Sequence, residues 1–534
     1  MNINSKSLHF RKMTIIPVFL LMVALLVQGC GAATPTAAPA TAAPTTPTEV
    51  ATAVPTAVTP AFTGTFKVAT QPLVKTDPAV ISSDPEVFVA NAVYDYLVDV
   101  TPGNTIVPRL ATDWTTSADG LTYVFTLASG VTFHDGSAFS ANDVVWTFNR
   151  LRDPNSGFPT VDLYKNIADI KATGDLQVTF TLSAPNPFFL YDLSDNHALI
   201  MKADTKDPND FNGTGPFVVS KYSPEDRIIL TANPTYFVAG EPKLAELDVI
   251  FFNDQSAMVD ALKGGDVDLV MALSTDLFSG LKDAAGITQL QAATNQFDVV
   301  RLRSDKGPGK DPKVMQALKL GLDRQAVYDL VMGGFGVLGS DTPIGPMYTN
   351  FYQNVTLPAK DVAKAKQLLA DAGYASGLSL DLYTPDTGDR PKLAAVLENQ
   401  WADIGVKINV IVEPESVYYG DNGWMAVDLG ITGWGSRPYP QFYLDMMLKC
   451  NAAWNESHFC DSEFDTLATT AGTTLDESKR VDAYHSIQTL LQDHGSLIIP
   501  YFYTQLAGIN SKFQGFELKA FSGRSDVRTV SLNQ

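Results

Sequence analysis

A stretch of alanine, threonine and proline near the start of the chain limits which residues can fold. Residues 31–62 contain six prolines and a single charged residue, Glu49. This composition cannot bury a core and favours a semi-extended tether, whose reach is at most ~100 Å at about 3.1 Å per residue. The folded body therefore begins near Phe62. Since the whole chain has 534 residues, this folded body is long enough for roughly three domains or one large two-lobed unit.

The segment before this tether has the pattern of an export signal. A positively charged start is followed by the apolar run 15–27, whose 13 residues are fewer than the ~18 to 20 that a membrane-spanning helix needs. The run ends in "LLVQGC", which resembles a bacterial lipoprotein signal that is cleaved before Cys30 and diacylated on that thiol. A cysteine at the cleavage point disfavours the alternative, a retained single-pass anchor. We expect a signal peptide at 1–29, a lipidated tether at 30–62 and an extracytoplasmic protein, periplasmic or on the cell surface, anchored to the cell membrane.

The charge of the chain argues against polyanionic partners. The whole sequence has 38 Lys and Arg against 58 Asp and Glu, a net charge of −20. Removal of the signal peptide takes away Lys6, Arg11 and Lys12 and no acidic residue, which brings the net charge to about −23. Such a surface repels phosphate backbones, so we expect no nucleic-acid partner.

Two cysteines follow Cys30, and their spacing suggests a short disulfide loop. Cys450 and Cys460 lie in "KCNAAWNESHFCDSEFD". In an oxidising compartment we expect them to pair and to stabilise the fold by roughly 3 kcal/mol. The alternative is a metal site that adds His458, but His-x-Cys without a fourth nearby ligand is a poor zinc pattern. The histidines never pair at i, i+4, so we expect no resident metal and no cofactor.

The segment "VTFHDGSAFSANDVVWTFNRL" raises the hypothesis of a hydrolase, because His134, Asp135 and Ser137 lie within four positions. The alternating residues before it predict a hairpin with Asp135 and Ser137 in the turn. Ser140 and Asp143 then form an S-x-x-D capping box at the start of an amphipathic helix. A catalytic triad assembles from distant elements, so we interpret these residues as turn and cap residues.

A second local pattern predicts the fold class. Residues 378–383 read as a strand, Pro391 opens a helix with an apolar face, and residues 406–412 alternate as a second strand. Two strands joined by one helix form a βαβ unit, in which the strands are parallel.

The widest resemblance to a known family begins in the region of the hairpin. The stretch "LATDWTTSADGLTYVFTLASGVTFHDGSAFSANDVVWTFNRL" is similar to the signature region of the family 5 extracytoplasmic solute-binding proteins, the peptide, dipeptide and nickel receptors of bacterial ABC importers. Further segments follow in the family's order: "GTGPFVVSKYSPEDRIILTANPTYF", "ALKGGDVDLV", "DPKVMQALKLGLDRQAVYDLV", "AKQLLADAGY" and "RVDAYHSIQTLLQDHGSLIIPYFYTQ". The resemblance covers roughly residues 63–520.

This resemblance implies an α/β protein of the two-lobed periplasmic-binding type, in the large class with an extra subdomain. Its lobes are joined by two hinge strands, and the ligand cleft lies between them. We place the hinge crossings near "FDVVRLRS" and "LIIPYFYTQ". Lobe one then consists of residues 63–302 and 503–534, and lobe two of residues 303–502.

The resemblance also implies a function. Hinge closure captures a solute, in the first place an oligopeptide or dipeptide, for delivery to the permease subunits of an ABC transporter. A lipid tether fits this role, because delivery needs a high local concentration at the membrane rather than turnover. We expect a monomer that is not an enzyme. Two alternatives stay open: the same fold binding an oligosaccharide, an opine or other carboxylate, or a metal chelate, and an exported hydrolase that uses scattered carboxylates.

The segment "ITGWGSRPYPQFY", residues 431–443, is the candidate ligand site. Peptide-binding relatives have a similar Gly-Trp followed by an aspartate-rich segment ending in Asp-Pro, and one of these aspartates pairs with the ligand's α-ammonium group. Here that acid is missing, and Arg437 is the only charged residue between Trp434 and Pro440. We expect Arg437 to anchor a ligand carboxylate or to pair across the closed cleft.

Aromatic residues near this segment complete the predicted lining. We expect Trp434 to form an apolar wall of the pocket. Further candidates for the lining are Tyr383, Tyr418, Trp424 and Tyr439. The alternative is that Trp434 packs in the core, since tryptophan is highly buried on average, and that Arg437 pairs internally with one of the many acids.

Overall fold

The central element of the structure is a mixed β-sheet. The computed structural model describes residues 62–420 and 423–533. The predicted signal peptide, Cys30 and the tether up to residue 61 lie outside these residues and stay predictions. The strands of the sheet are β1 (Thr65–Thr70), β8 (Phe217–Ser223), β9 (Arg227–Ala232), β10 (Glu246–Phe251), β11 (Leu269–Val270), β12 (Ile287–Leu302), β13 (Gly336–Leu338), β14 (Leu378–Pro385), β15 (Val406–Glu413), β16 (Leu429–Trp434), β17 (Leu497–Ile498) and β18 (Tyr501–Asn510).

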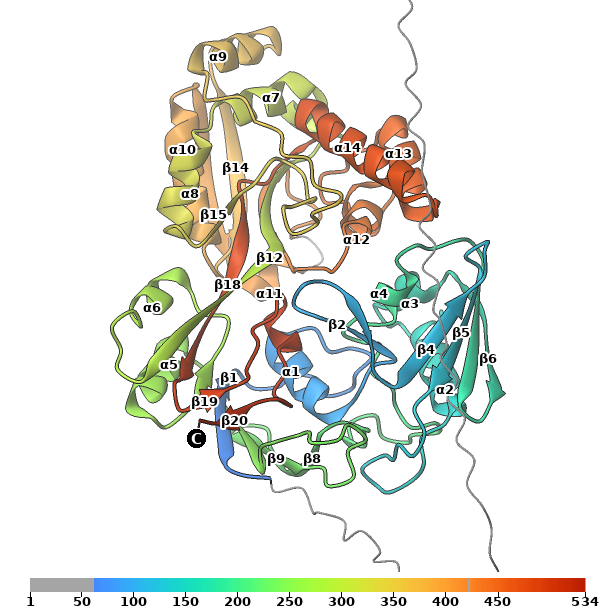
Figure 1. Ribbon diagram of the computed structural model, residues 1–534. Helices are drawn as coiled ribbons and strands as arrows, with labels where there is room; N and C mark the ends of the chain where they lie inside the picture. The colour runs from blue at the N-terminus through green and yellow to red at the C-terminus, as the bar shows by residue number, and fades with distance from the viewer. Residues whose placement is uncertain (1–61, 421–422, 534) are drawn as a thin grey trace, which may run out of the picture. The chain divides into compact units, whose positions relative to one another are not determined.

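The order of these strands shows where the two halves of the sheet meet. From one edge to the other it is β15, β14, β16, β12, β18, β11, β1, β10, β9, β8, with β13 beside β18 and β17 beside β12. The central pair, β12 and β18, is antiparallel, and Figure 1 shows it linking the region of β14 to the region of β1. Its register shifts between Ala293 and Phe297. The predicted hinge crossings, near residues 297–304 and 497–505, fall on this part of the sheet.

Helices pack around both halves of the sheet. Those of lobe one are α1 (Asp84–Val93), α2 (Ala141–Leu151), α3 (Val161–Tyr164), α4 (Phe189–Asp192), α5 (Gln255–Gly264) and α6 (Thr275–Ser279). Those of lobe two are α7 (Pro312–Leu320), α8 (Arg324–Met332), α9 (Val362–Asp371), α10 (Arg390–Ala402), α11 (Glu415–Tyr418), α12 (Gln441–Tyr443), α13 (Ser462–Thr473) and α14 (Glu477–His494).

Buried apolar side chains form separate clusters on the two sides of the β12–β18 pair. The buried members of two clusters lie within residues 66–281 and 506–530. Those of the other two are Phe188 and residues within 297–502. Along β12 the change of cluster coincides with the register shift. Residues 297–302 therefore pack with lobe two, although the predicted division assigns them to lobe one.

The predicted βαβ unit is confirmed. Strands β14 and β15 are parallel, with Leu378 opposite Val406, and α10 connects them. Trp401 of α10 is fully buried, and its indole N–H donates to the carbonyl oxygen of Leu318 at 2.9 Å. The helix is thereby fixed to α7 as well as to the sheet.

The extra subdomain is a four-stranded antiparallel sheet with α2. Its strands, in the order β4–β5–β7–β6, are β4 (Ala111–Thr116), β5 (Thr122–Leu127), β7 (Gln177–Leu182) and β6 (Ile167–Gly174). Helix α2 begins after Ser140, as predicted, and the Ser140 backbone N–H donates to Asp143 Oδ2 at 2.7 Å. Two small two-stranded sheets pair β2 (Val98–Val100) with β3 (Ile106–Pro108) and β19 (Phe513–Gln514) with β20 (Ser531–Leu532).

The residues that resembled a triad belong to a turn, as their spacing predicts. Ser137 Oγ donates to Asp135 Oδ1 at 2.5 Å, and the Ser137 backbone N–H contacts the same oxygen at 2.9 Å. The ring of His134 faces the carbonyl oxygens of Gly215 and Phe211, at 3.0 and 3.4 Å. Since the imidazole does not contact Ser137, it cannot serve as its base in this arrangement.

Cys450 and Cys460 are joined by a disulfide, with their Cα atoms 4.6 Å apart. In the described part of the chain, three or more His, Cys, Asp or Glu side chains nowhere gather in a way that could hold a metal ion. Within the same residues no helix has both the length and the apolar character needed to cross a membrane.

Candidate functional site

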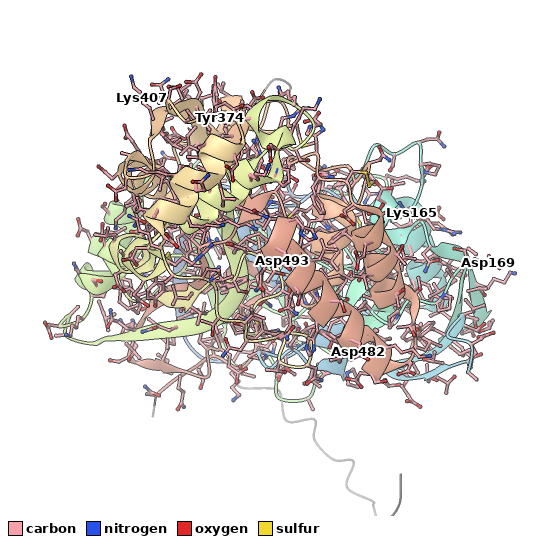
Figure 2. All side chains as sticks on the ribbon, turned by 90° about the horizontal axis from the view of Figure 1, so that it is seen from above. Lys165, Asp169, Tyr374, Lys407, Asp482 and Asp493 are labelled. Carbon is pink, nitrogen blue, oxygen red and sulfur yellow. A yellow bond between two sulfur atoms is a disulfide. The ribbon has the colours of Figure 1, made fainter. Side chains whose placement is uncertain are left out.

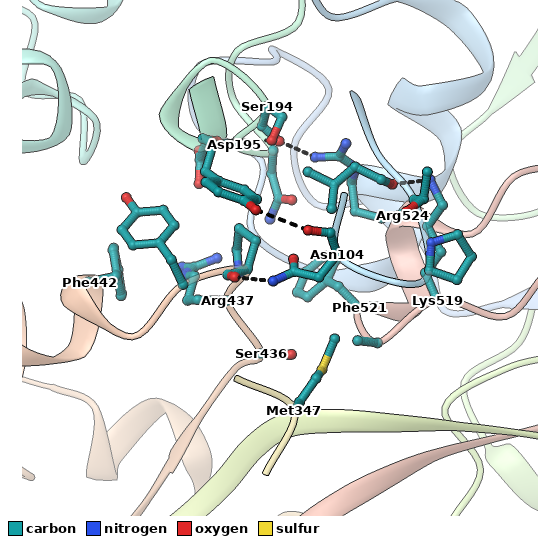
Figure 3. A pocket seen from close by; sticks show the side chains of 18 of the residues that line it. Asn104, Ser194, Asp195, Met347, Ser436, Arg437, Phe442, Lys519, Phe521 and Arg524 are labelled. Carbon is teal, nitrogen blue, oxygen red and sulfur yellow. Dashed lines mark hydrogen bonds between the residues drawn. The ribbon is translucent and has the colours of Figure 1, made fainter. Parts of the chain in front are cut away.

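Two neighbouring cavities lie where lobe one meets lobe two. The smaller, of about 80 Å³, is lined by segments 100–104, 191–196 and 519–524 of lobe one and by Met347 and segment 436–442 of lobe two (Figure 3). The larger, of about 270 Å³, lies between segments 159–166 and 184–197 of lobe one and 437–473 of lobe two. Both cavities share five lining residues, namely Asp192, Asp195, Arg437, Tyr439 and Phe442.

The loop after β16 carries Arg437 into this cleft. Strand β16 ends at Trp434, and α12 begins at Gln441. Between them the backbone is fixed from both lobes. Tyr348 Oη donates to the carbonyl oxygen of Arg437 at 2.8 Å, and Asn104 Nδ2 of lobe one donates to that of Pro438 at 2.5 Å. The loop around Arg437 is therefore held through its backbone carbonyl groups.

The guanidinium group of Arg437 has an aromatic neighbour and no acceptor. Its Cζ lies 4.4 Å from the ring centroid of Phe442, within the range of a cation–π contact. Its Nε is buried and unpartnered, and among the described residues the side chain makes neither a hydrogen bond nor an ion pair. A buried donor without an acceptor is costly, so this group favours an incoming anion.

The other two cations of the smaller cavity are already neutralised. Arg524 Nη2 donates to Asp99 Oδ1 at 2.6 Å, and Lys519 Nζ lies 3.7 Å from the same oxygen. Burial would raise the pKa of Asp99, but Arg524, Lys519 and Arg109 lower it below the usual range. Of the described cations that line this cavity, Arg437 is thus the one without a carboxylate at ion-pair distance, although its charge acts on nearby Asp195.

Two carboxylates of lobe one lie near Arg437 and Tyr439, and their pKa values are shifted in opposite directions. Burial opposes the charge of Asp195, but His197, whose Nδ1 lies 2.5 Å from Asp195 Oδ1, and Arg437 lower its pKa below the usual range. Asp192 accepts hydrogen bonds from Tyr439 Oη and, at 2.7 Å, from Asn186 Nδ2. Burial nevertheless raises the pKa of Asp192 to about 7.

Of the predicted lining residues, the structure brings Arg437 and Tyr439 to the cavities. Trp434 differs from the expectation of an apolar wall, because it is 6% exposed and lies in the core of lobe two. Its indole N–H donates to Glu456 Oε1 at 3.1 Å. Tyr383 lies half-buried on β14 and lines neither cavity.

Trp434, Tyr418 and Trp424 instead surround one buried ion pair. Arg301 Nε lies 3.0 Å from Glu456 Oε2, and both side chains are at most 1% exposed. Tyr418 Oη is 3.0 Å from the Oγ1 atom of Thr432, which donates to Glu456, and the Trp424 carbonyl oxygen accepts from Arg301. These aromatic residues line neither cavity.

Several lining residues were not predicted from the sequence. Phe442 lies within the identified segment 431–443, whereas Asp192 and Asp195 lie outside the identified segments, and in an acidic chain no local pattern distinguishes two aspartates from the others. Lys519 and Arg524 come from the C-terminal segment, more than 80 residues after Arg437. Only the fold brings them to the same cavity.

Comparison with known proteins identifies the family of the chain. The family model described as bacterial extracellular solute-binding proteins, family 5, middle part, matches residues 105–455. Di/tripeptide-binding protein 1 of Pseudomonas aeruginosa (strain UCBPP-PA14) is 29% identical over 441 residues, which cover 76% of this chain and 82% of the relative.

Solved structures of the same architecture also match. The ABC transporter-associated periplasmic binding protein DppA from Helicobacter pylori, in complex with the peptide STSA, has a TM-score of 0.77 at 24% identity and covers 89% of this chain and 99% of its own. The binding protein AgaA from A. tumefacien R10, in complex with agropinic acid, has a TM-score of 0.77 at 22% identity, covering 88% and 99%. Both show the two-lobed fold. This chain belongs to the bacterial extracellular solute-binding proteins of family 5.

Proposed function

We propose that this protein is a receptor that captures an oligopeptide or dipeptide in the cleft beside Arg437 and delivers it to an ABC transporter permease. The observation that carries the proposal is the free guanidinium group between two cavities at the meeting of the lobes. The di/tripeptide-binding relative and the peptide-bound structural neighbour support peptide as the ligand class.

The geometry gives each residue a role in binding. A ligand carboxylate accepts two parallel hydrogen bonds from Arg437, whose plane is held by the ring of Phe442. Asp195, kept ionised by His197 and Arg437, offers a negative charge to a ligand ammonium group in the same cleft. Closure of the lobes removes water from these pairs and strengthens them.

A second ligand class has its own supporting observation. Arg437 occupies the segment where peptide-binding relatives carry the aspartate that pairs with an α-ammonium group. The structural neighbour AgaA holds agropinic acid, a solute that is not a peptide. A non-peptide carboxylate, such as an opine, is therefore the alternative ligand.

We propose binding without turnover as the activity of the chain, since its family consists of binding proteins. The test is calorimetric titration of the purified protein with di-, tri- and longer peptides and with non-peptide carboxylates, followed by mass spectrometry of the incubated ligands. Saturable heat with a peptide and an intact ligand support the proposal. Binding confined to non-peptide carboxylates, or peptide cleavage that tracks the pure protein, contradicts it.

The tether is a separate part of the proposal. We propose a monomeric body anchored to the membrane by lipidated Cys30, with residues 31–62 as its spacer. Cys30→Ser then gives a protein that is released from the membrane, or keeps its signal peptide, and binds ligand as before. Fractionation and titration measure both properties. Membrane retention of a processed Cys30→Ser chain contradicts the anchor.

A further inference from the structure

Phe188 of lobe one is buried in the hydrophobic cluster of lobe two. It precedes α4 and is 4% exposed. Its ring stacks on Tyr439, with centroids 4.8 Å apart and planes at 8°, and meets the edge of Phe351 at 6.1 Å. Phe351 in turn contacts Tyr484 of α14 at 4.7 Å. The ring of Phe188 in lobe one thus packs among aromatic rings of lobe two.

The same segment adds a polar contact beside the stacked rings. Tyr439 Oη donates to Asp192, which lies at the end of α4. Asn186 orients Asp192 and Phe188, because its Nδ2 donates to Asp192 at 2.7 Å and its Oδ1 accepts from the Phe188 backbone N–H at 2.9 Å. Tyr439 is therefore held on its face by Phe188 and at its hydroxyl by Asp192.

We infer that Phe188 is a positioning residue for ligand binding, which holds the two lobes together through Tyr439 whether or not a ligand is present. Every contact in this latch, defined as Phe188, Asp192, Tyr439 and Phe351, is made by the protein itself. Opening the cleft would return two aromatic faces and a buried hydroxyl to water, which opposes opening.

The latch has a consequence for affinity. The apparent dissociation constant of a closed-state ligand rises as the closed fraction falls. Loss of the Phe188 ring therefore weakens binding. Because Phe188 also lines the larger cavity, the distance between the lobes, and not affinity, is the quantity that tests this role. This inference rests on the proposed function only in placing the ligand between the lobes.

The test measures the distance between the lobes without any peptide. Spin labels are attached to the cysteines of an Asp169→Cys, Asp482→Cys variant. Asp169 lies on β6 and Asp482 on α14, on different lobes (Figure 2). At pH 5.5 we expect a short distance population to predominate in the full chain, and a second, longer population to appear in Phe188→Ala. Phe188→Tyr keeps an aromatic ring at this position and should retain the short population without any ligand.

The matched control is Leu190→Ala, because Leu190 lies two residues away and packs against the lobe-one cluster. We expect its distance distribution to equal that of the parent chain. Tyr439→Phe removes the hydroxyl and keeps the ring, so it should give an intermediate closed fraction. A parent protein that is open without peptide, or a Phe188→Ala distribution unchanged from the parent, overturns the inference. Because no ligand is needed, this result is independent of whether the ligand is a peptide.

Discussion

Asp192 shows how a single residue can make closure depend on pH. Burial raises the pKa of its carboxyl group to about 7, and two further carboxylates, Asp195 and Asp445, raise it as well, while the hydrogen bonds from Tyr439 and Asn186 lower it. In an open cleft the group regains water and its pKa falls toward its ordinary value of 3.8. The closed form therefore binds a proton that the open form releases.

The sign of the pH effect follows from this difference. Because the closed-state pKa is raised, the advantage of the closed form is fully present below the ordinary pKa and is lost as pH rises toward 7. We predict that ligand affinity falls by about tenfold between pH 5.5 and pH 8. Titration calorimetry at both values measures it.

Asp192→Asn provides the control for this prediction, because it keeps an acceptor for Tyr439 and removes the titration. Its affinity should change little over the same pH range. An equally steep fall in Asp192→Asn would assign the pH dependence to another group.

At the scale of elements, the start of α2 depends more on Asp143 than on the capping serine. Asp143 is 5% exposed and accepts from the Ser140 backbone N–H, from Ser140 Oγ at 3.0 Å and from the Ala203 backbone N–H at 2.8 Å. Hydrogen bonds to a charged group are worth roughly 1.5 to 3 kcal/mol, against about 1 kcal/mol for a lost cap.

We predict that Ser140→Ala lowers the free energy of unfolding by about 1 kcal/mol, and Asp143→Ala by about 2 to 3 kcal/mol. Ligand affinity should stay unchanged in both, since neither residue lines the cavities. Denaturant unfolding and calorimetry measure the two quantities. A tenfold loss of affinity in Ser140→Ala with unchanged stability would contradict a purely structural role.

Elements with a strong local pattern could be predicted from the sequence. The alternation in 378–383 and 406–412 and the cap at Ser140 reflect local energetics, so strand, helix and turn assignments there are confirmed. Trp434 differs because its surroundings are set by tertiary contacts. Glu456, 22 residues later, accepts from its indole N–H. No periodicity in "ITGWGSRPYP" contains that information.

At the scale of the whole molecule, the two-lobed fold was predicted from the family resemblance and is shown by the comparison with solved structures. The composition of the cleft was predicted only for Arg437 and Tyr439. The remaining charged residues of the smaller cavity come from segments around residues 192 and 520, which the fold brings together with Arg437. Contacts between residues so far apart in the chain leave no recognisable pattern in a single sequence.

The central claim is that Arg437 binds a ligand carboxylate between the lobes. The direct measurement is a double cycle, in which the best-binding peptide and its C-terminal amide are each titrated into the parent protein and into Arg437→Ala. Arg227→Ala is the matched control, since Arg227 lies on β9 and lines neither cavity. We predict that the amide binds the parent and Arg227→Ala more weakly than the free acid by roughly 1.5 to 3 kcal/mol, and that both ligands bind Arg437→Ala equally. Equal binding of acid and amide to the parent protein, or a difference that persists in Arg437→Ala, would contradict the account.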